Sequence, residues 1–192
     1  MTRIAVLDAH PDPDRARFVH ALADSYVDGA QGAGHKVRRI ELAKLDFPLL
    51  RSAADWTDGE PPAVLKRAQD TIAWAEHIVI FYPLWLGDMP ALLKGFLEQV
   101  ARPGFAIPAG KRNMSGGLLK GRSARLVVTM GMPAFFYRFY FGAHSVKSFE
   151  RNILKFVGIK PVHHSLIGAI EGSAEAREKW IEEMTQLGAG AK

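Results

Sequence analysis

The sequence predicts a doubly wound α/β protein built on a five-stranded parallel sheet, and two observations predict it. Short apolar runs alternate along the chain with longer segments of helical periodicity, which is the order typical of βα units. Three of these runs are almost continuously apolar, as are strands that helices cover on both faces of a parallel sheet. A chain of 192 residues is long enough to bury a core, and we expect a single domain over residues 1–192.

Five runs are expected to form the strands. Four stand out by their apolar character, whereas the second along the chain alternates in polarity and suits an edge strand. In chain order they are Ile4–Asp8, Lys36–Leu42, His77–Tyr82, Arg125–Met130 and Val162–Ile167.

Apolar residues spaced three or four positions apart mark five helices between and after these strands. The spaced residues are Phe18, Leu22 and Tyr26; Leu65, Ala68 and Ile72; Leu92, Phe96 and Val100; Val146, Phe149, Ile153 and Phe156; and Ala176, Trp180, Met184 and Leu187. Right-handed crossovers leave few topologies for such a chain. The flavodoxin-like three-layer sandwich, with strand order 2-1-3-4-5, is the commonest for five strands.

Three connections are unusually long, over residues 43–62, 103–123 and 131–143. Long loops in a compact domain are rarely without function. In open α/β sheets the ligand binds beyond the carboxyl ends of the strands. The loops after Asp8, Tyr82 and Met130 all lie at that edge, so the sequence predicts one site built from three separated segments.

The loop after the first strand has the outline of an anion site. Prolines at 11 and 13 end the strand, and a helix is expected to begin near Asp14, whose carboxylate could cap it. The free amides and the dipole of a helix start attract anions. His10, Arg15 and Arg17 add donors at the same place. A capped surface helix with solvated arginines explains the segment equally well.

The loop after the third strand combines a flat apolar wall with free backbone amides. It reads "PLWLGDMPALLKGFLEQVARPGFA", with Trp85 and Leu86 in the loop itself. The segments Leu92–Gly95 and Pro103–Ala106 make this stretch similar to the NAD(P)H:quinone oxidoreductases of the flavodoxin-like superfamily. The quinone reductases and the ancillary flavoproteins of bacterial potassium-efflux systems both belong there. The resemblance runs from residue 4 to about residue 187.

The resemblance implies that a flavin ring lies on this loop. Its ring contacts would be Pro83, Leu84, Trp85 and Leu86, with Trp85 as a core anchor the alternative. The phosphate would lie near His10 and Phe18, which match the family. Family members carry Ser or Thr hydroxyls where this chain has Arg15 and Arg17, so arginine charge is expected to replace hydroxyl donors.

The loop after the fourth strand contains six aromatic residues between Phe135 and Phe141. Such a cluster either stacks on flat ligands or forms a subunit contact. By resemblance, Thr129, Met130 and Gly131 contact the pyrimidine edge of the flavin. Tyr137 falls at a catalytic Tyr position, and His144 fits the catalytic His with a one-residue shift.

The chemistry accounts for both catalytic side chains. Both would stabilise the negative charge that develops on the ring when hydride arrives. The alternatives are a surface histidine at a helix start for His144 and a packed interface aromatic for Tyr137.

The predicted function is a flavin-dependent NAD(P)H oxidoreductase. Hydride passes from NAD(P)H through flavin N5 to quinones or similar acceptors, and one pocket for both substrates predicts ping-pong kinetics. FMN is the expected cofactor, with FAD as the alternative. The resemblance implies a homodimer with sites at its interface, formed by the aromatic loop and the 92–100 helix. A regulatory flavoprotein subunit of a membrane transport system and a flavin-free binding module are the competing interpretations.

The composition restricts the classes of molecule that the protein is expected to bind. The formal charge of +5 is spread along the chain, and its densest cluster is Lys111, Arg112, Lys120, Arg122 and Arg125. It fits a phosphorylated small molecule better than nucleic acid. No apolar run approaches the roughly 20 residues of a membrane span, and no signal pattern opens the chain, so we expect a cytoplasmic protein without membrane insertion.

We expect no cysteine chemistry, no metal site and no glycosylation. The chain has no cysteine, and its histidines are too scattered to predict a metal site. Asn113–Ser115 matches a glycosylation acceptor, which we interpret as chance.

Overall fold

The computed structural model describes residues 1–110 and 116–192. Lys111 and Arg112 of the basic cluster, and the acceptor sequence at 113–115, lie outside the described residues. Within the described part of the chain, no helix is long and apolar enough to cross a membrane.

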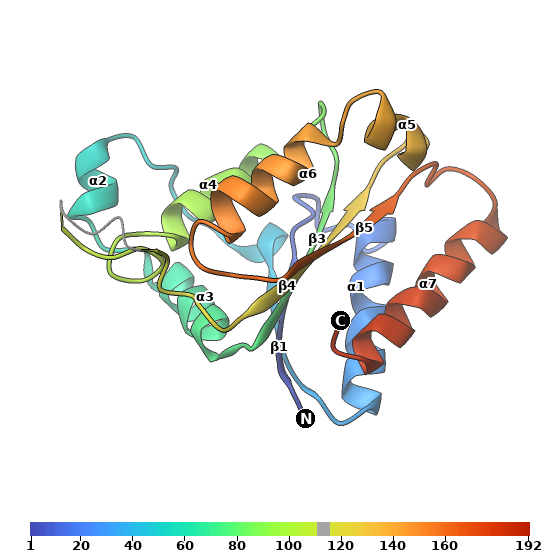
Figure 1. The fold of residues 1–192 in the computed structure, drawn as a ribbon, viewed down its shortest axis with the longest axis horizontal. Coiled ribbons are helices and arrows are strands. Elements are labelled where there is room, and N and C mark those ends of the chain that lie inside the picture. The colour runs from blue at the N-terminus through green and yellow to red at the C-terminus, as the bar shows by residue number, and fades with distance from the viewer. Residues whose placement is uncertain (111–115) are drawn as a thin grey trace.

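The sheet has five parallel strands in the order β2-β1-β3-β4-β5 (Figure 1). The strand order predicted from the sequence is therefore confirmed. Every residue of β3 is buried, as expected for a strand covered on both faces. The strands are β1 (Arg3–Asp8), β2 (Lys36–Glu41), β3 (His77–Pro83), β4 (Ser123–Thr129) and β5 (Val162–Ile167).

Helices cover both faces of this sheet, which makes the three-layer sandwich (Figure 1). One face carries α1 (Phe18–Gly32) and α7 (Ala174–Ala189), which pack along each other. Their backbones come close because each offers a glycine: a Cβ at Gly29 would lie 2.0 Å from the Thr185 carbonyl oxygen. The other face carries α3 (Ala63–Trp74), α4 (Ala91–Val100), α6 (His144–Ser148) and the π-helical turn η2 (Phe149–Leu154) that continues α6.

The start of the first helix differs from the prediction. α1 begins at Phe18 rather than near Asp14, and Asp14 does not cap it. Instead, Asp14 Oδ1 accepts the N–H of Ala16 at 3.0 Å, and Asp12 Oδ1 accepts the N–H of Asp14 at 2.9 Å. These side chains form local turns that compete with the helix for the same amides, which delays its first turn.

Two of the long connections contain short helices that the sequence pattern did not predict. The 43–62 connection includes η1 (Leu42–Lys44) and α2 (Ala53–Thr57), and the 131–143 connection includes α5 (Ala134–Phe139). Ser52 caps α2 by accepting the N–H of Asp55 at 3.1 Å. Such helices are too short to show a clear period of hydrophobicity.

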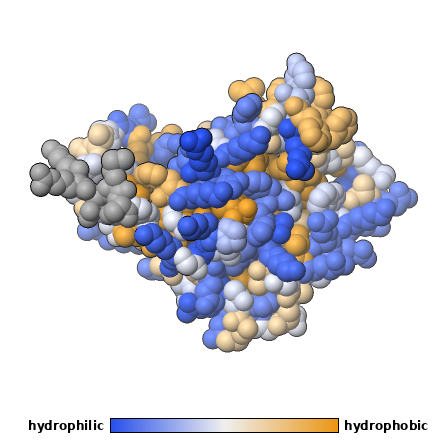
Figure 2. Space-filling view, viewed as in Figure 1, coloured by the Kyte–Doolittle hydropathy of each residue, from blue (hydrophilic) through white to orange (hydrophobic). Residues whose placement is uncertain are grey.

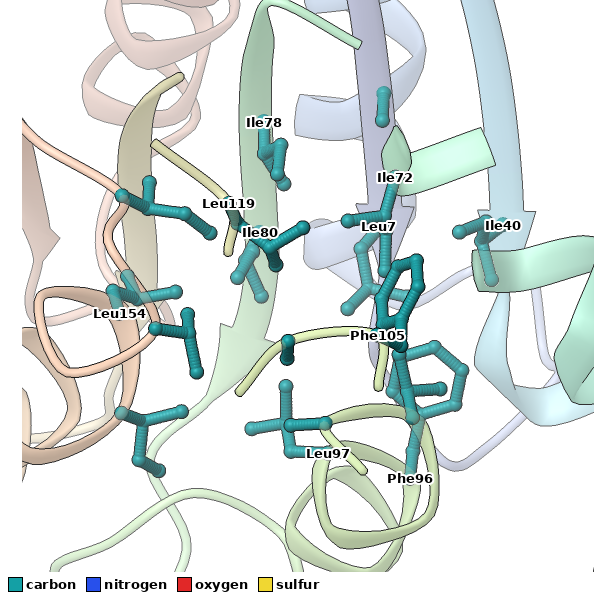
Figure 3. Close-up of a pocket in the computed structure, with 17 residues that line it drawn as sticks. Leu7, Ile40, Ile72, Ile78, Ile80, Phe96, Leu97, Phe105, Leu119 and Leu154 are labelled. Carbon is teal, nitrogen blue, oxygen red and sulfur yellow. The ribbon is translucent and has the colours of Figure 1, made fainter. Parts of the chain in front are cut away.

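The core on the α3/α4 side encloses a small cavity of ≈ 50 Å³ (Figure 3). Its lining is apolar throughout, with Leu7, Ile78 and Ile80 from the strands facing the rings of Phe96 and Phe105. Because it offers a ligand no polar partner, we interpret it as a packing void of the core.

Candidate functional site

The carboxyl ends of the three inner strands lie together, as the sequence predicts. The N–H of Ala9 donates to the carbonyl of Phe81 at 2.8 Å, which joins the loop after β1 to β3. The N–H of Leu84 donates to the carbonyl of Thr129 at 2.8 Å, which joins the loop after β3 to β4. The three predicted loop segments therefore form one edge of the sheet.

The loop after β3 is a tight two-residue hairpin. Trp85 and Asp88 exchange backbone hydrogen bonds of 2.9 and 3.0 Å. Between them, Leu86 has φ = 48° and Gly87 φ = 80°, the left-handed pair of a type I′ turn. A leucine rarely adopts this conformation, and such strain gathers at ligand sites.

The two apolar side chains of this hairpin face outwards. Leu86 is fully exposed at the tip, and the Trp85 side chain is 47% exposed. The indole therefore does not act as a core anchor. One edge of it rests against His10, in a T-shaped contact with 5.6 Å between ring centroids. That contact leaves a flat apolar face open beside the strand ends.

His10 connects this hairpin to the loop after β1. Its ring is buried, and Nδ1 accepts the N–H of Asp12 at 3.0 Å. Burial lowers the pKa of His10 below 6.5, and the neighbouring ring of His20 lowers it further. The neutral ring therefore has Nε2–H as its remaining donor.

The two predicted phosphate-binding arginines both lie beside carboxylates. Arg15 pairs with Asp24. Arg17 pairs with Asp12 at 2.8 Å and lies 3.6 Å from Asp14. Both arginine side chains are about half exposed. They stand near the start of α1, but their charge is already balanced there, a point that sequence spacing alone could not reveal.

Beneath this loop lies a buried polar network that the sequence analysis missed. Asp8 ends β1 and is almost fully buried. Its Oδ2 lies 2.7 Å from His20 Nδ1 and accepts from Arg39 Nη2 at 2.6 Å. A carboxylate that ends an apolar strand was the available signal for this network.

The last residue of β4 supplies a buried polar atom at the site. Thr129 Oγ1 is buried and has no hydrogen-bond partner among residues 1–110 and 116–192. Met130 next to it is buried, whereas Gly131 is exposed. A buried hydroxyl without a partner costs free energy, and a ligand atom at this edge would supply one.

The two predicted catalytic residues occupy different environments. His144 is exposed at the first position of α6. Tyr137 is buried, and its hydroxyl lies 2.6 Å from Ser145 Oγ and 3.4 Å from the N–H of Val146. The Tyr137 hydroxyl therefore points at the start of α6 rather than at the open surface.

The remaining aromatic residues of this loop form an exposed patch, here called the α5 patch. Phe136 and Tyr140 stack at 4.8 Å with 7° between their planes. Figure 2 shows apolar surface over α5 and at the tip of the β3 hairpin, on the same side of the molecule. The exposed members of the patch are Phe135, Phe136, Phe139, Tyr140 and Phe141.

A larger hollow of ≈ 640 Å³ lies elsewhere, between α2 and the 103–110 segment. Trp56, Ile107 and Phe156 are among its lining residues. It stands apart from the strand ends that carry His10, Trp85 and Thr129.

Comparison with known proteins places the chain in a family. The family model described as flavodoxin-like fold matches residues 2–187, and the chain belongs to this family. The resemblance drawn from the sequence is thereby confirmed.

Two relatives from Haemophilus influenzae show where in the family the chain lies. It is 30% identical to an uncharacterized NAD(P)H oxidoreductase, with 92% of this chain and 89% of the relative covered. It is 27% identical to an FMN-dependent NADH:quinone oxidoreductase, with 93% and 92% covered.

Two solved structures share the fold. The NAD(P)H:quinone oxidoreductase from Methanothermobacter marburgensis superposes with a TM-score of 0.81 at 22% identity, covering 99% of this chain and 96% of that one. An FMN-dependent NADH-azoreductase from Bacillus anthracis, solved in complex with FMN, has a TM-score of 0.77 at 16% identity, covering 100% and 99%.

Proposed function

We propose that this protein is an FMN-dependent NAD(P)H oxidoreductase that reduces quinones or similar acceptors. One observation carries the proposal. At the carboxyl edge of the sheet, a strained hairpin holds a half-exposed indole, and the strand hydrogen-bonded to that hairpin ends in a buried threonine hydroxyl with no partner among the described residues. A planar ring with polar edges matches that combination. The relatives, one named as an NAD(P)H oxidoreductase and the other as an FMN-dependent NADH:quinone oxidoreductase, support the same assignment.

The residues present fit the cofactor. The ring would lie on Pro83, Leu84, Trp85 and Leu86, and its pyrimidine edge would lie near Thr129, Met130 and Gly131. The phosphate would be received at the start of α1, where Phe18 begins the helix and His10 offers Nε2–H. Because the arginines there are already paired with carboxylates, Arg15 and Arg17 contribute less than a pair of free charges would.

A bound flavin supplies a ring nitrogen that accepts hydride from NAD(P)H and passes it to the acceptor. In this proposal the exposed His144 would donate a proton where negative charge develops. Tyr137 acts through Ser145 and the first amides of α6, which its hydroxyl contacts. The hairpin excludes water from one face of the ring.

One open face serves both substrates in turn, so we propose ping-pong kinetics. We further propose a homodimer in the cytoplasm, with the α5 patch in its interface, because an apolar patch of this kind marks an association surface. The 92–100 helix is a weaker candidate for that interface than the sequence suggested, since Leu93 and Phe96 face the core and Lys94 pairs with Glu98 outside. The regulatory alternative gains no support from the relatives, which are named as oxidoreductases.

The test combines cofactor identification with steady-state kinetics. We expect the purified protein to be yellow and to release FMN on denaturation. We also expect parallel lines in double-reciprocal plots when NADH and a quinone are varied together. A colourless protein that fails to take up added FMN would refute the proposal, and intersecting lines would refute the kinetic part alone.

A further inference from the structure

The backbone of Asp12 is held between two buried histidines. Its N–H donates to His10 Nδ1 at 3.0 Å, and its carbonyl oxygen lies 2.9 Å from His20 Nε2. The other nitrogen of His20, Nδ1, lies 2.7 Å from Asp8 Oδ2. The two imidazoles lie against each other, with 5.4 Å between centroids. Together they fix the loop that leads from β1 into α1.

Both partners of His20 are hydrogen-bond acceptors. A backbone carbonyl has no proton to give. Asp8 Oδ2 already accepts from Arg39 and lies 3.7 Å from an Arg15 guanidinium nitrogen, so this oxygen faces His20 as an acceptor. A neutral imidazole has one N–H and would leave one buried acceptor unpaired. The cationic ring, with a proton on each nitrogen, satisfies both.

We propose that His20 is an imidazolium and acts as a positioning residue, holding the loop after β1 in the shape that receives the cofactor's phosphate group. The inference rests on the proposed function for the identity of that ligand. It assigns opposite protonation states to the two rings that hold Asp12, here called the histidine clamp (His10 and His20). His10 accepts through Nδ1 and is neutral, whereas His20 donates twice and is charged.

The surrounding charges explain why a cation is needed at this position. Five carboxylates and three guanidinium groups surround the clamp, so the loop without a charged His20 carries excess negative charge at the place where a phosphate would bind. The imidazolium removes part of that excess and also fixes the loop. The groups, which come from β1, β2, α1 and the loop between β1 and α1, are Asp8, Asp12, Asp14, Asp24, Glu41, Arg15, Arg17 and Arg39.

The protonation state can be measured directly on the wild-type protein as purified. Long-range ¹H–¹⁵N NMR spectra of the histidine rings at neutral pH should show both nitrogens of His20 protonated. His35 is a matched control: its Nδ1 accepts the N–H of Thr2 at 3.0 Å and its Nε2 faces the carbonyl of Ala189 at 3.0 Å, so it should be a neutral Nε2–H ring. A His20 spectrum with one unprotonated nitrogen, like that of His35, overturns the proposal.

The positioning role is tested with FMN and riboflavin, which differ by the phosphate group. His20→Gln can pair only one of the two acceptors, so the Kd for FMN should rise about tenfold. The Kd for riboflavin should stay unchanged, and His35→Gln should alter neither. Equal weakening of both flavins would indicate a merely structural role and overturn the positioning claim.

The two proposals can fail separately. If FMN preference depends on His20 but no quinone is reduced by NAD(P)H, the proposed function is wrong and this inference stands. If turnover is normal and the preference for FMN over riboflavin is unaffected by His20→Gln, this inference is wrong and the function stands.

Discussion

At the scale of single residues, the histidines of this chain differ in what their ring nitrogens face. His10 accepts the N–H of Asp12 through Nδ1, and its pKa is lowered. His144 is exposed to solvent. His77 is buried at the start of β3, where Nδ1 lies 2.7 Å from Ser123 Oγ. The same side chain therefore meets three different environments in this fold.

The buried His77 should make the fold sensitive to acid. Burial, and next to it the nearby charge of Arg125, lower the pKa of His77 to about 4. The unfolded chain takes up this proton near pH 6.5 and the folded chain only near pH 4. The folded state is thus fully favoured above pH 6.5 and loses about 3 kcal/mol as pH falls through that window.

Urea denaturation between pH 7 and pH 4 measures this loss as a falling free energy of unfolding. His77→Leu should flatten the dependence, whatever its effect at neutral pH. His163→Leu, which removes an exposed histidine from β5, should change the slope only slightly, since His163 is the smallest of the causes that lower the pKa of His77. An unchanged slope in His77→Leu would assign the acid sensitivity to other groups.

Among the catalytic candidates, exposure separates His144 from Tyr137. His144→Ala should lower kcat about a hundredfold with FMN content unchanged, since it removes a proton donor. Tyr137→Phe should cost about 1 kcal/mol of stability, because it leaves the Ser145 hydroxyl without its partner. Steady-state kinetics and thermal unfolding measure both effects. Tyr140→Phe removes an exposed hydroxyl from the same loop, and a large loss of kcat there would transfer the role to Tyr140.

At the scale of elements, sequence reasoning succeeded where burial is uniform. β1, β3 and β4 are apolar because helices cover both of their faces, so the pattern predicts them directly. The start of α1 could not be predicted, because Asp12 and Asp14 take backbone amides into local turns. The ion pair of Arg15 reaches Asp24 in α1, which the spacing within its own loop does not reveal. Arg17 pairs with Asp12 of the same loop, so in that case a nearby carboxylate in the sequence was the available signal.

The hairpin after β3 places an exposed leucine in a strained backbone conformation, which lowers the stability of the fold. Leu86→Asn places the residue type that favours a type I′ turn at φ = 48°, and should raise the free energy of unfolding by about 1 kcal/mol. It also removes apolar contact from the site, so FMN or quinone affinity should fall. Thermal unfolding of the flavin-free protein and the quinone KM measure the two effects. Leu49→Asn, an exposed leucine elsewhere, is the control, and a destabilised Leu86→Asn would contradict the strain argument.

At the scale of the whole molecule, the apolar surface over α5 lies on the same side as the tip of the β3 hairpin (Figure 2). The sequence predicted the aromatic density but not that residues 134–139 form a helix with several rings outside it. An exposed surface of this kind is a liability for a chain that remains alone in water. The proposed homodimer would cover this surface.

The α5 patch should hold two copies together. Phe135→Ser combined with Phe139→Ser should weaken the homodimer about a hundredfold, since buried aromatic anchors dominate such interfaces. Sedimentation velocity over a concentration series measures the shift towards monomer. Phe156→Ser removes an exposed aromatic from another surface and should leave the dimer intact. A wild-type protein that sediments as a monomer at all concentrations would refute the dimer, and a double variant that remains dimeric would place the interface elsewhere.

The cavity on the α3/α4 side of the sheet has a consequence for the stability of the protein under hydrostatic pressure. Unfolding eliminates the ≈ 50 Å³ of empty space between the strands and α4, so the unfolded chain occupies less volume. Hydrostatic pressure therefore favours opening of the α3/α4 side of the core (Figure 3). His10, Trp85 and His20 contact one another at the strand ends and α1. None of these three residues lines the cavity. Under compression, the layer behind the sheet should thus loosen before the cofactor loop does.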